Sequence, residues 1–252
     1  MSDGARINVY DSQSADYHRA FQVFLDHTDQ KVNARRWLDA LVEGLPARRL
    51  YIDAGAGNGQ VTAWFTARFE RTIAIEPNPS LAAELRHACP SAELLQTGIL
   101  QATPGGQGDL VLCSHVLYYV DRHEWLPIID RMASWLAPGG VLAVVLQNHD
   151  TDCMRMLEAF SGRRFDLSDV TREFGAAHQG RYRIELQQVA AHVTAPELTT
   201  AYTVGEFMLN LIPLPNPPDS AAVESYILQH FGAAGGGFRF SCHQDILVIR
   251  PN

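Results

Sequence analysis

The chain lacks the features that mark zinc-binding, secreted or membrane-spanning proteins. No two of its four cysteines form a Cys-x-x-Cys pair, which argues against a zinc site or a redox dithiol. The N-terminus has no apolar signal core, and no apolar run approaches the ~20 residues needed to cross a bilayer. Scattered single thiols suit a reducing compartment. We therefore expect a cytoplasmic protein with no metal and no membrane partner. The cysteines are Cys89, Cys113, Cys153 and Cys242.

A long basic run is also absent, and the formal net charge is -8. That balance argues against nucleic acid as the main partner, since phosphate binding needs clustered cations. Hydrophobic residues make up 46% of the 252 residues, enough for a substantial core. The length fits one α/β domain, alone or with a small elaboration.

What the sequence does contain is a regular alternation of strands and helices. The apolar runs at 50–52, 72–75, 92–96, 109–114 and 141–146 predict strands. The segments 61–69, 80–88 and 125–136 predict helices, and 138–140 predicts a turn. Unbroken apolar strands separated by helices predict a parallel sheet that is buried on both faces.

Less regular segments flank this alternation. Apolar residues at helical spacing predict a helical arm over 14–43, ended by Gly44 and Pro46. Further helices are expected at 150–160, 196–212 and 219–231, and two longer strands near 181–193 and 238–249. The proline-rich stretch 213–218 predicts a loop, because proline removes helix donors.

A glycine loop follows the first strand. Gly55, Gly57 and Gly59 come just after Asp53, and small residues let a ligand approach the backbone at the start of a helix. Glu76 ends the second strand about 20 residues later, where a carboxylate can accept both hydroxyls of a ribose. The spacing is GxGxG, which differs from the GxGxxG of dinucleotide folds. Together they predict a nucleotide-like ligand; the alternative is a tight turn beside a solvated glutamate.

These motifs resemble those of class I S-adenosylmethionine-dependent methyltransferases, as do 109–114 and 136–140. The resemblance implies a Rossmann-like, doubly wound, mostly parallel seven-stranded sheet with an antiparallel last strand and an N-terminal helical lid. It implies S-adenosylmethionine as cofactor and S-adenosylhomocysteine as product. The loop would lie under the methionine part, with Glu76 at the ribose and 97–99 near the adenine. The implied cofactor-binding residues are Asp53, Gly55, Gly57, Gly59, Glu76, Pro77, Thr97, Gly98, Ile99 and Ser114.

A finer resemblance lies outside this core. The segments 17–28, 117–120 and 245–249 are similar to the histamine N-methyltransferase type, in which the arm and the segment after strand four line the substrate pocket. Gln30 replaces an amine-binding glutamate of that type and His115 replaces a glutamine, which argues against histamine itself. Bacterial relatives of this shape include indole C3-methyltransferases of tryptophan-derived cyclic dipeptides. The implied substrate-binding residues are Tyr17, Phe21, Phe24, Gln30, Tyr118, Tyr119 and Phe207.

Three residues are candidates for the chemistry. His115 follows strand four at its C-terminal end, where open α/β sheets bind ligands, and an imidazole can take a proton at neutral pH. The alternative is a histidine packed in the core beside Tyr118. Glu206 lies in an apolar helix segment, where it either accepts a substrate N–H or faces solvent. Tyr17 can stack on an aromatic substrate.

The sequence therefore predicts an S-adenosylmethionine-dependent methyltransferase of a small aromatic nitrogen-containing metabolite, with C3 of an indole as the favoured acceptor in secondary metabolism. The alternatives are an N-methyltransferase of a simple amine, a nicotinamide-dependent oxidoreductase and a non-catalytic cofactor-binding protein. The oxidoreductase is disfavoured by the GxGxG spacing and by the lack of a Tyr-x-x-x-Lys pair. We expect a monomer or homodimer with one domain over 1–252. Its parts would be an arm or lid (1–46), a cofactor-binding core (47–149), and substrate-side helices with the last two strands (150–252).

Overall fold

The computed structural model describes residues 5–10 and 14–252, which group into two compact units. We call them the sheet unit and the helical unit. The sheet unit contains Arg35–Leu146, Leu167–Gln188 and Asp245–Asn252. The helical unit contains the described part of Met1–Ala34 together with Gln147–Asp166 and Val189–Gln244. Each unit is thus built from interleaved chain segments. The three consecutive parts of one domain stay a prediction.

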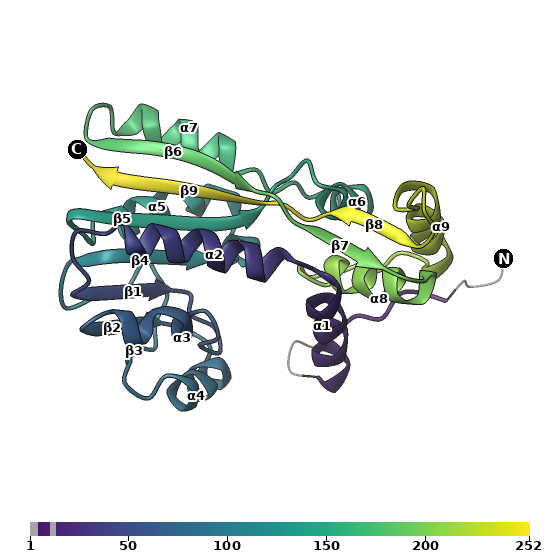
Figure 1. Ribbon diagram of the computed structural model, residues 1–252, viewed down its shortest axis with the longest axis horizontal. Coiled ribbons are helices and arrows are strands. Elements are labelled where there is room, and N and C mark those ends of the chain that lie inside the picture. The colour runs from purple at the N-terminus through teal and green to yellow at the C-terminus, as the bar shows by residue number, and fades with distance from the viewer. Residues whose placement is uncertain (1–4, 11–13) are drawn as a thin grey trace. The chain divides into compact units, whose positions relative to one another are not determined.

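A seven-stranded sheet, in the order β3-β2-β1-β4-β5-β9-β6, forms the centre of the sheet unit (Figure 1). The pairs β1–β2, β1–β4, β2–β3 and β4–β5 are parallel, and one strand of the sheet is antiparallel. This confirms the predicted Rossmann-like fold. The strands are β1 Leu50–Ala54, β2 Arg71–Ile75, β3 Glu93–Leu95, β4 Gly108–Ser114, β5 Leu136–Gln147, β6 Tyr182–Val189 and β9 Gln244–Pro251.

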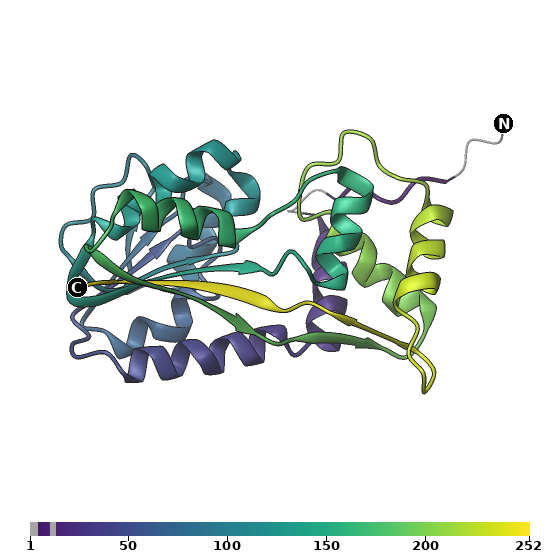
Figure 2. The same cartoon turned by 90° about the horizontal axis from the view of Figure 1, so that it is seen from above.

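Helices cover both faces of this sheet, as expected for buried parallel strands. Figure 2 shows α5 (Trp125–Ala133) and α7 (Leu167–Ala177) on one face and α2 (Gln30–Glu43) on the other. Helix α4 (Pro79–Ala88) begins where the sequence suggests, because Asn78 accepts from the N–H groups of Ser80 and Leu81. Every residue of β1 is buried.

The predicted helical arm is confirmed and consists of two helices, α1 (Ala15–His27) and α2, with Thr28 and Asp29 between them. Three other predictions about these elements were wrong in detail. The helix expected over 61–69 is a four-residue α3 (Thr62–Phe65) followed by a short 3-10 turn. The predicted helix 125–136 ends at Ala133. The predicted turn 138–140 lies inside β5, because Leu136 already pairs with Gly108 of β4 before an irregularity in the register. Helix α7 was not predicted.

The helical unit is organised around α8 (Leu198–Leu209), which packs against α1, α6 (Asp152–Ser161), α9 (Ser220–His230) and β7. Strands β7 (His192–Ala195) and β8 (Phe238–Ser241) form an antiparallel pair. Gly205 permits the close approach of α8 and α9, since a Cβ there would lie 2.9 Å from Ile227 Cδ1. None of the helices within the described residues is both long and apolar enough to span a membrane.

Residues 5–10 run along the helical unit as an extended segment. The N–H of Ile7 donates to the Pro218 carbonyl at 3.1 Å, and the N–H of Ser220 donates to the Ala5 carbonyl at 2.8 Å. The Ile7 side chain is buried. These bonds fix the segment against the loop 213–218, which the structure confirms as irregular.

Candidate active site

The glycine loop leaves β1 and folds back onto β2. The N–H groups of Gly55 and Ala56 both donate to the Ile75 carbonyl, at 2.9 and 3.0 Å. All three loop glycines have positive φ angles, 80° at Gly55, 56° at Gly57 and 87° at Gly59. Residues with a side chain rarely adopt this backbone, so the GxGxG pattern follows from the turn itself.

The surroundings of the three glycines show where a ligand can approach. A Cβ at Gly55 would lie 2.4 Å from Val116 Cγ2, and one at Gly59 would lie 2.6 Å from Leu85 Cδ1. A Cβ at Gly57 would have no heavy atom within 4 Å. Gly55 and Gly59 are therefore required by packing. Gly57 is the position of the loop that lies beside open space.

Glu76 is tied directly to this open part of the loop. Its Oε2 accepts from the Gly57 N–H at 2.9 Å, and its Oε1 accepts from the Asn78 N–H at 2.8 Å. The side chain is buried. Each carboxylate oxygen carries a further lone pair, so Glu76 can still accept two hydroxyl groups. These residues fit the ribose role that the resemblance implies.

Asp53, at the end of β1, has a different environment. It is 1% exposed, and its Oδ2 accepts from the Thr62 hydroxyl at 2.6 Å. Burial raises the pKa of this carboxyl from 3.8 to about 6, and the charge of nearby Glu76 adds to the rise. The contact with Thr62 joins the end of β1 to α3. Its predicted role as a cofactor ligand stays a prediction.

The turn after β3 lies beside Glu76, because the Leu95 carbonyl accepts from the N–H groups of both Glu76 and Thr97. The Gly98 carbonyl then accepts from Gln101 and Ala102. The structure thus brings 97–99 close to the carboxylate predicted to hold the ribose. Of the other implied cofactor residues, Ile99 is buried, Ser114 is half-buried at the end of β4 and Pro77 is exposed.

His115 directly follows β4 and has an unusual backbone. Its φ is 59°, and no other non-glycine residue in the described ranges 5–10 and 14–252 has a positive φ. Its N–H donates to the Val145 carbonyl at 2.9 Å, which fixes the turn to β5. The next residue, Val116, is the one that packs against Gly55. The candidate base therefore lies one residue from a side chain that touches the glycine loop.

The aromatic residues after His115 differ in exposure. The Tyr118 ring is buried and stacks against the imidazole, with centroids 5.9 Å apart and planes inclined by 16°. Tyr119 is 67% exposed. His115 therefore lies at the end of β4, as its predicted catalytic role requires. Its ring also packs beside Tyr118, which was the alternative that the sequence left open.

In the helical unit, five rings form what we call the aromatic cluster. Tyr17 lies 5.6 Å from Phe207, and Phe21 and Phe24 each lie 5.4 Å from it. Tyr17 and Phe21 stack at 6.3 Å. The sequence predicted all four of these. The fifth ring, Tyr10, meets Tyr17 edge-on at 6.5 Å and was not predicted.

Glu206 is buried, so its predicted solvent-facing alternative is wrong. Its Oε1 accepts from the Asn8 N–H at 2.8 Å, and both oxygens lie 3.2 Å from Asn8 Nδ2. The Tyr10 hydroxyl donates to Oε2. Burial and this carboxylate raise the pKa of Tyr10. Glu206 thus holds residues 8–10 on α8, a contact between segments far apart in sequence.

Gln30 is also buried, and its Nε2 donates to the Cys242 carbonyl at 2.8 Å. This contact joins the start of α2 to the chain after β8. The predicted catalytic and substrate-binding residues accordingly fall into two sets. His115, Tyr118 and Tyr119 lie in the sheet unit, and Tyr17, Phe21, Phe24, Gln30, Glu206 and Phe207 lie in the helical unit.

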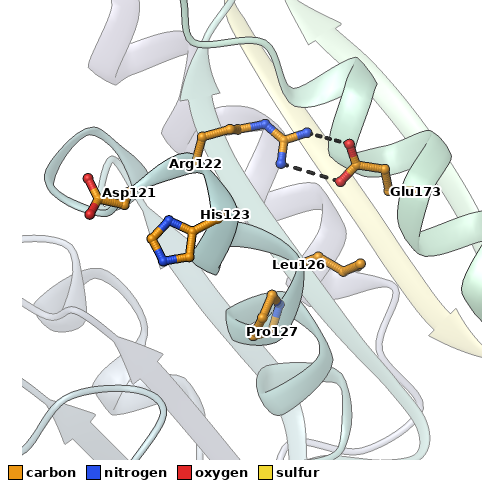
Figure 3. Close-up of a pocket in the computed structure, with 6 residues that line it drawn as sticks. All are labelled: Asp121, Arg122, His123, Leu126, Pro127 and Glu173. Carbon is orange, nitrogen blue, oxygen red and sulfur yellow. Dashed lines mark hydrogen bonds and ion pairs between the residues drawn. The ribbon is translucent and has the colours of Figure 1, made fainter.

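An open hollow lies at the start of α5, outside the predicted site. Figure 3 shows Arg122 turned toward Glu173, with nitrogen–oxygen distances of 2.7 and 3.3 Å. Asp121, His123 and Glu124 have ligand atoms within 4.8 Å of one another, close enough to hold a metal ion, but none of the three is buried. The expected absence of a metal stays a prediction. The hollow is lined by Asp121, Arg122, His123, Leu126, Pro127 and Glu173.

Comparison with known proteins gives the family. A family model described as a methyltransferase domain matches residues 25–197. A trans-aconitate 2-methyltransferase of Methylobacterium radiotolerans is 34% identical over 107 residues, which cover 42% of this chain and 40% of that protein. One from an Acidovorax species is 32% identical over 137 residues, which cover 52% of each. The chain thus spans about half the length, or less, of these relatives.

Solved structures share the fold at low identity. A methyltransferase structure from Bacillus halodurans has a TM-score of 0.60 at 13% identity, covering 95% of this chain and all of that one. The N-methyltransferase NodS of Bradyrhizobium japonicum, solved with S-adenosylhomocysteine, has a TM-score of 0.51 at 14% identity, covering 93% of this chain and 85% of that one.

Proposed function

The chain belongs to the methyltransferase domain family, and from this premise we propose that it transfers the methyl group of S-adenosylmethionine to a small molecule. The observation that carries the proposal is the pairing of Glu76 with Gly57. One buried carboxylate with spare lone pairs contacts the one loop glycine that lies beside open space. That is the arrangement needed to hold a ribose next to a backbone-lined cofactor site.

The residues of the sheet unit then have separate roles. Glu76 accepts the ribose hydroxyls, Gly57 leaves room for the methionine part, and 97–99 flank the adenine. When bound, the cofactor supplies a methyl group on a sulfonium, which is already reactive. The protein therefore has to align the acceptor and take up a proton. His115 is our candidate for the proton, because it follows β4 and is fixed through Val116 to the glycine loop.

For the acceptor, we propose a flat unsaturated or aromatic molecule that packs on the rings of the helical unit. The aromatic cluster supports this, because ring faces recognise flat groups. The indole of a tryptophan-derived metabolite fits such a surface and remains our first candidate. The matched relatives act on trans-aconitate by name, so an unsaturated carboxylate is the second candidate. A simple amine is a third.

Binding of S-adenosylhomocysteine tests the cofactor site. It should raise the melting temperature in a dose-dependent way, and NAD should not. Glu76→Gln should weaken this binding by about tenfold or more, since hydrogen bonds to a charged group contribute ~1.5–3 kcal/mol. Glu84→Gln, at an exposed position of α4, is the matched control. A wild-type protein that NAD stabilises and S-adenosylhomocysteine does not would point to the oxidoreductase alternative.

Methyl transfer itself is tested with methyl-labelled S-adenosylmethionine and a panel of acceptors. The panel contains trans-aconitate, tryptophan, a tryptophan-containing cyclic dipeptide, tryptamine and, for comparison, simple aliphatic amines. Label in any product establishes a methyltransferase, and the position of the label in the product identifies the methylated atom and the acceptor class. Cofactor binding with no transfer to any flat acceptor, but with transfer to aliphatic amines, would contradict the proposed acceptor class.

A further inference from the structure

Strand β6 is the last strand of the seven-stranded sheet, and among the described residues only β9 pairs with it (Figure 1). The part of β6 in the sheet unit ends at Gln188. Three of its polar side chains are exposed, those of Arg183, Gln187 and Gln188, and so is the apolar side chain of Leu186. An open strand edge presents backbone N–H and C=O groups that can pair with a strand of another chain.

The backbone groups directed to this open edge belong to alternate residues. Just before β6, the Arg181 carbonyl accepts from the Asn252 N–H at 3.1 Å, so the backbone of Arg181 is directed to the side of β9. Backbone direction alternates along a strand, and the groups of Tyr182, Ile184 and Leu186 are therefore directed to the open edge. Each of these three residues can donate one hydrogen bond to an added strand and accept one from it.

The side chains of β6 alternate between two faces of different chemistry. On one face, Arg183 and Glu185 form an ion pair at 2.6 Å. Tyr182, Ile184 and Leu186 lie on the other face, which contacts α7. The strand thus has opposite charges two residues apart on one face and apolar side chains on the other.

We propose that the open edge of β6 pairs antiparallel with the same edge of a second copy of this chain, with Ile184 on the two-fold axis. A two-fold axis pairs identical surfaces, so each residue meets its complement twice. With Ile184 on the axis, Arg183 lies opposite Glu185 of the second copy, and Glu185 lies opposite its Arg183. On the other face, Tyr182 lies opposite Leu186. Opposite charges and apolar pairs directly across two strands both stabilise the pairing.

Charge selects this register over its neighbours. Residues that lie opposite each other share a face of the sheet, so the register can shift only by moving the axis to another residue. An axis at Arg183 would place two arginines opposite each other, and an axis at Glu185 would place two glutamates so. Like charges directly opposite destabilise a strand pair. The axis at Ile184 is the register between these two that pairs each charge with its opposite.

The predicted dimer is weak and reversible. A pairing confined to one strand edge buries less than the ~1,600 Å² of a standard interface. Sedimentation velocity over a concentration series should therefore show a wild-type dimer that dissociates on dilution. A wild type that is monomeric at every concentration overturns the inference.

Charge reversals test the surface. Arg183→Glu makes both positions acidic and Glu185→Arg makes both basic, so each variant alone should weaken the dimer about tenfold or more, because both symmetry-related pairs become like-charged. Arg71→Glu and Glu93→Arg make the same changes in an exposed ion pair near the opposite edge of the sheet, and they should not change the dimer. Variants of Arg183 and Glu185 that dimerise as the wild type does would refute the proposed surface.

Mixing the two variants separates pairing between chains from the ion pair within β6. Both variants lose the ion pair of their own strand, yet an equimolar mixture sets an acidic strand opposite a basic one. The mixture of Arg183→Glu with Glu185→Arg should therefore form a heterodimer at least as tight as the wild-type dimer, and added salt should weaken it. If the mixture stays monomeric, the inference is wrong.

Cysteine substitutions test the register. Residue 183 of one strand and residue 185 of the other form a non-hydrogen-bonded pair with Cα atoms ~4.5 Å apart, within the range of a disulfide. Under a mild oxidant, Arg183→Cys mixed with Glu185→Cys should give a disulfide-linked heterodimer. Arg183→Cys alone should not, because its two cysteines would be diagonal, about 7–8 Å apart. The four natural cysteines are buried and should not compete. Equal cross-linking of Arg183→Cys alone would contradict the register.

This inference goes beyond the proposed function and does not depend on it. The paired edge contains none of the residues assigned to the cofactor or the acceptor. None of the measurements uses S-adenosylmethionine or an acceptor, so the failure of either proposal leaves the other standing.

Discussion

Alanine substitutions can show which glycines of the loop are needed for packing and which for access of the ligand. The three variants are Gly55→Ala, Gly57→Ala and, outside the loop, Gly180→Ala. All three glycines have positive φ angles, of 80°, 56° and 74°. An alanine with this backbone lowers the free energy of unfolding by about 1–2 kcal/mol. The lower conformational entropy of its unfolded chain offsets about 0.4–1 kcal/mol of this loss. The net strain is thus on the order of 1 kcal/mol at each position. Gly180 lies in the turn before β6, so it supplies a control outside the loop.

The atoms around each glycine predict a larger loss of stability for Gly55→Ala than for the other two variants. The new methyl group would lie 2.4 Å from Val116 Cγ2 at Gly55, while nothing lies within 4 Å of it at Gly57 or Gly180. Overpacking adds about 1–3 kcal/mol, so Gly55→Ala should cost about 2–4 kcal/mol in total. With about 2–4 °C per kcal/mol in a chain of this size, Gly57→Ala and Gly180→Ala should each lower Tm by ~2–4 °C. Gly55→Ala should lower it by ~4–16 °C.

Calorimetry of the cofactor-free variants measures these shifts, and isothermal titration with S-adenosylhomocysteine measures binding. Gly57→Ala should lose at least about tenfold in affinity, since its methyl group fills space reserved for the ligand. Gly180→Ala should bind as the wild type does. Val116→Ala should rescue much of the Gly55→Ala loss, which a double-mutant cycle would show as non-additivity. Equal stability of Gly55→Ala and Gly57→Ala, or unchanged binding by Gly57→Ala, would refute the reasoning.

Three further predictions concern charged or strained residues. The pKa of Asp53 is raised from 3.8 to about 6, so the folded state holds its proton more tightly and ionisation costs stability as pH rises. From pH 5 to pH 7.5, the free energy of unfolding of Asp53→Asn, measured in urea, should therefore rise by about 1–1.5 kcal/mol relative to that of the wild type. No such rise would contradict this. Glu206→Gln should speed amide exchange over residues 7–10, while exposed Glu197→Gln should not. His115→Gly and His115→Ala should lower kcat by the same factor. Because residue 115 has a positive φ, His115→Gly should be about 1 kcal/mol more stable than His115→Ala.

Strands and turns with a local chemical cause could be predicted from the sequence. The runs at 50–52, 72–75 and 109–114 became β1, β2 and β4, because unbroken apolar segments fit a sheet buried on both faces. The glycine loop was found because only glycine adopts its backbone without strain. Both signals depend on a few consecutive residues, so no tertiary information was needed.

Elements stabilised by distant contacts could not be found this way. Helix α7 contains serine, aspartate, threonine and glycine, all weak helix formers. It is a helix because Leu167, Val170 and Phe174 share one buried face. In β5, the Pro-Gly-Gly sequence has the local signature of a turn. The pairing of Leu136 with Gly108 overrides it, and that pairing depends on β4.

The same limit applies to the candidate site. Glu206 could be chosen as a buried carboxylate in an apolar helix, but its partners Asn8 and Tyr10 lie nearly 200 residues away in the sequence. No local pattern connects them. Tyr10 was missed for that reason, although it completes the aromatic cluster.

The backbone of His115 provides an independent reason to give that residue a function. A positive φ costs a residue with a side chain about 1–2 kcal/mol, and glycine would remove this cost. The turn needs the conformation, because it places Val116 against Gly55 and lets the N–H of residue 115 reach Val145. These two contacts do not need an imidazole, whereas the stacking of the ring on the buried Tyr118 does. A histidine held in this strained backbone therefore points to a role for the ring itself, and stacking on Tyr118 and the proposed uptake of a proton are the two roles that the His115→Gly and His115→Ala variants test.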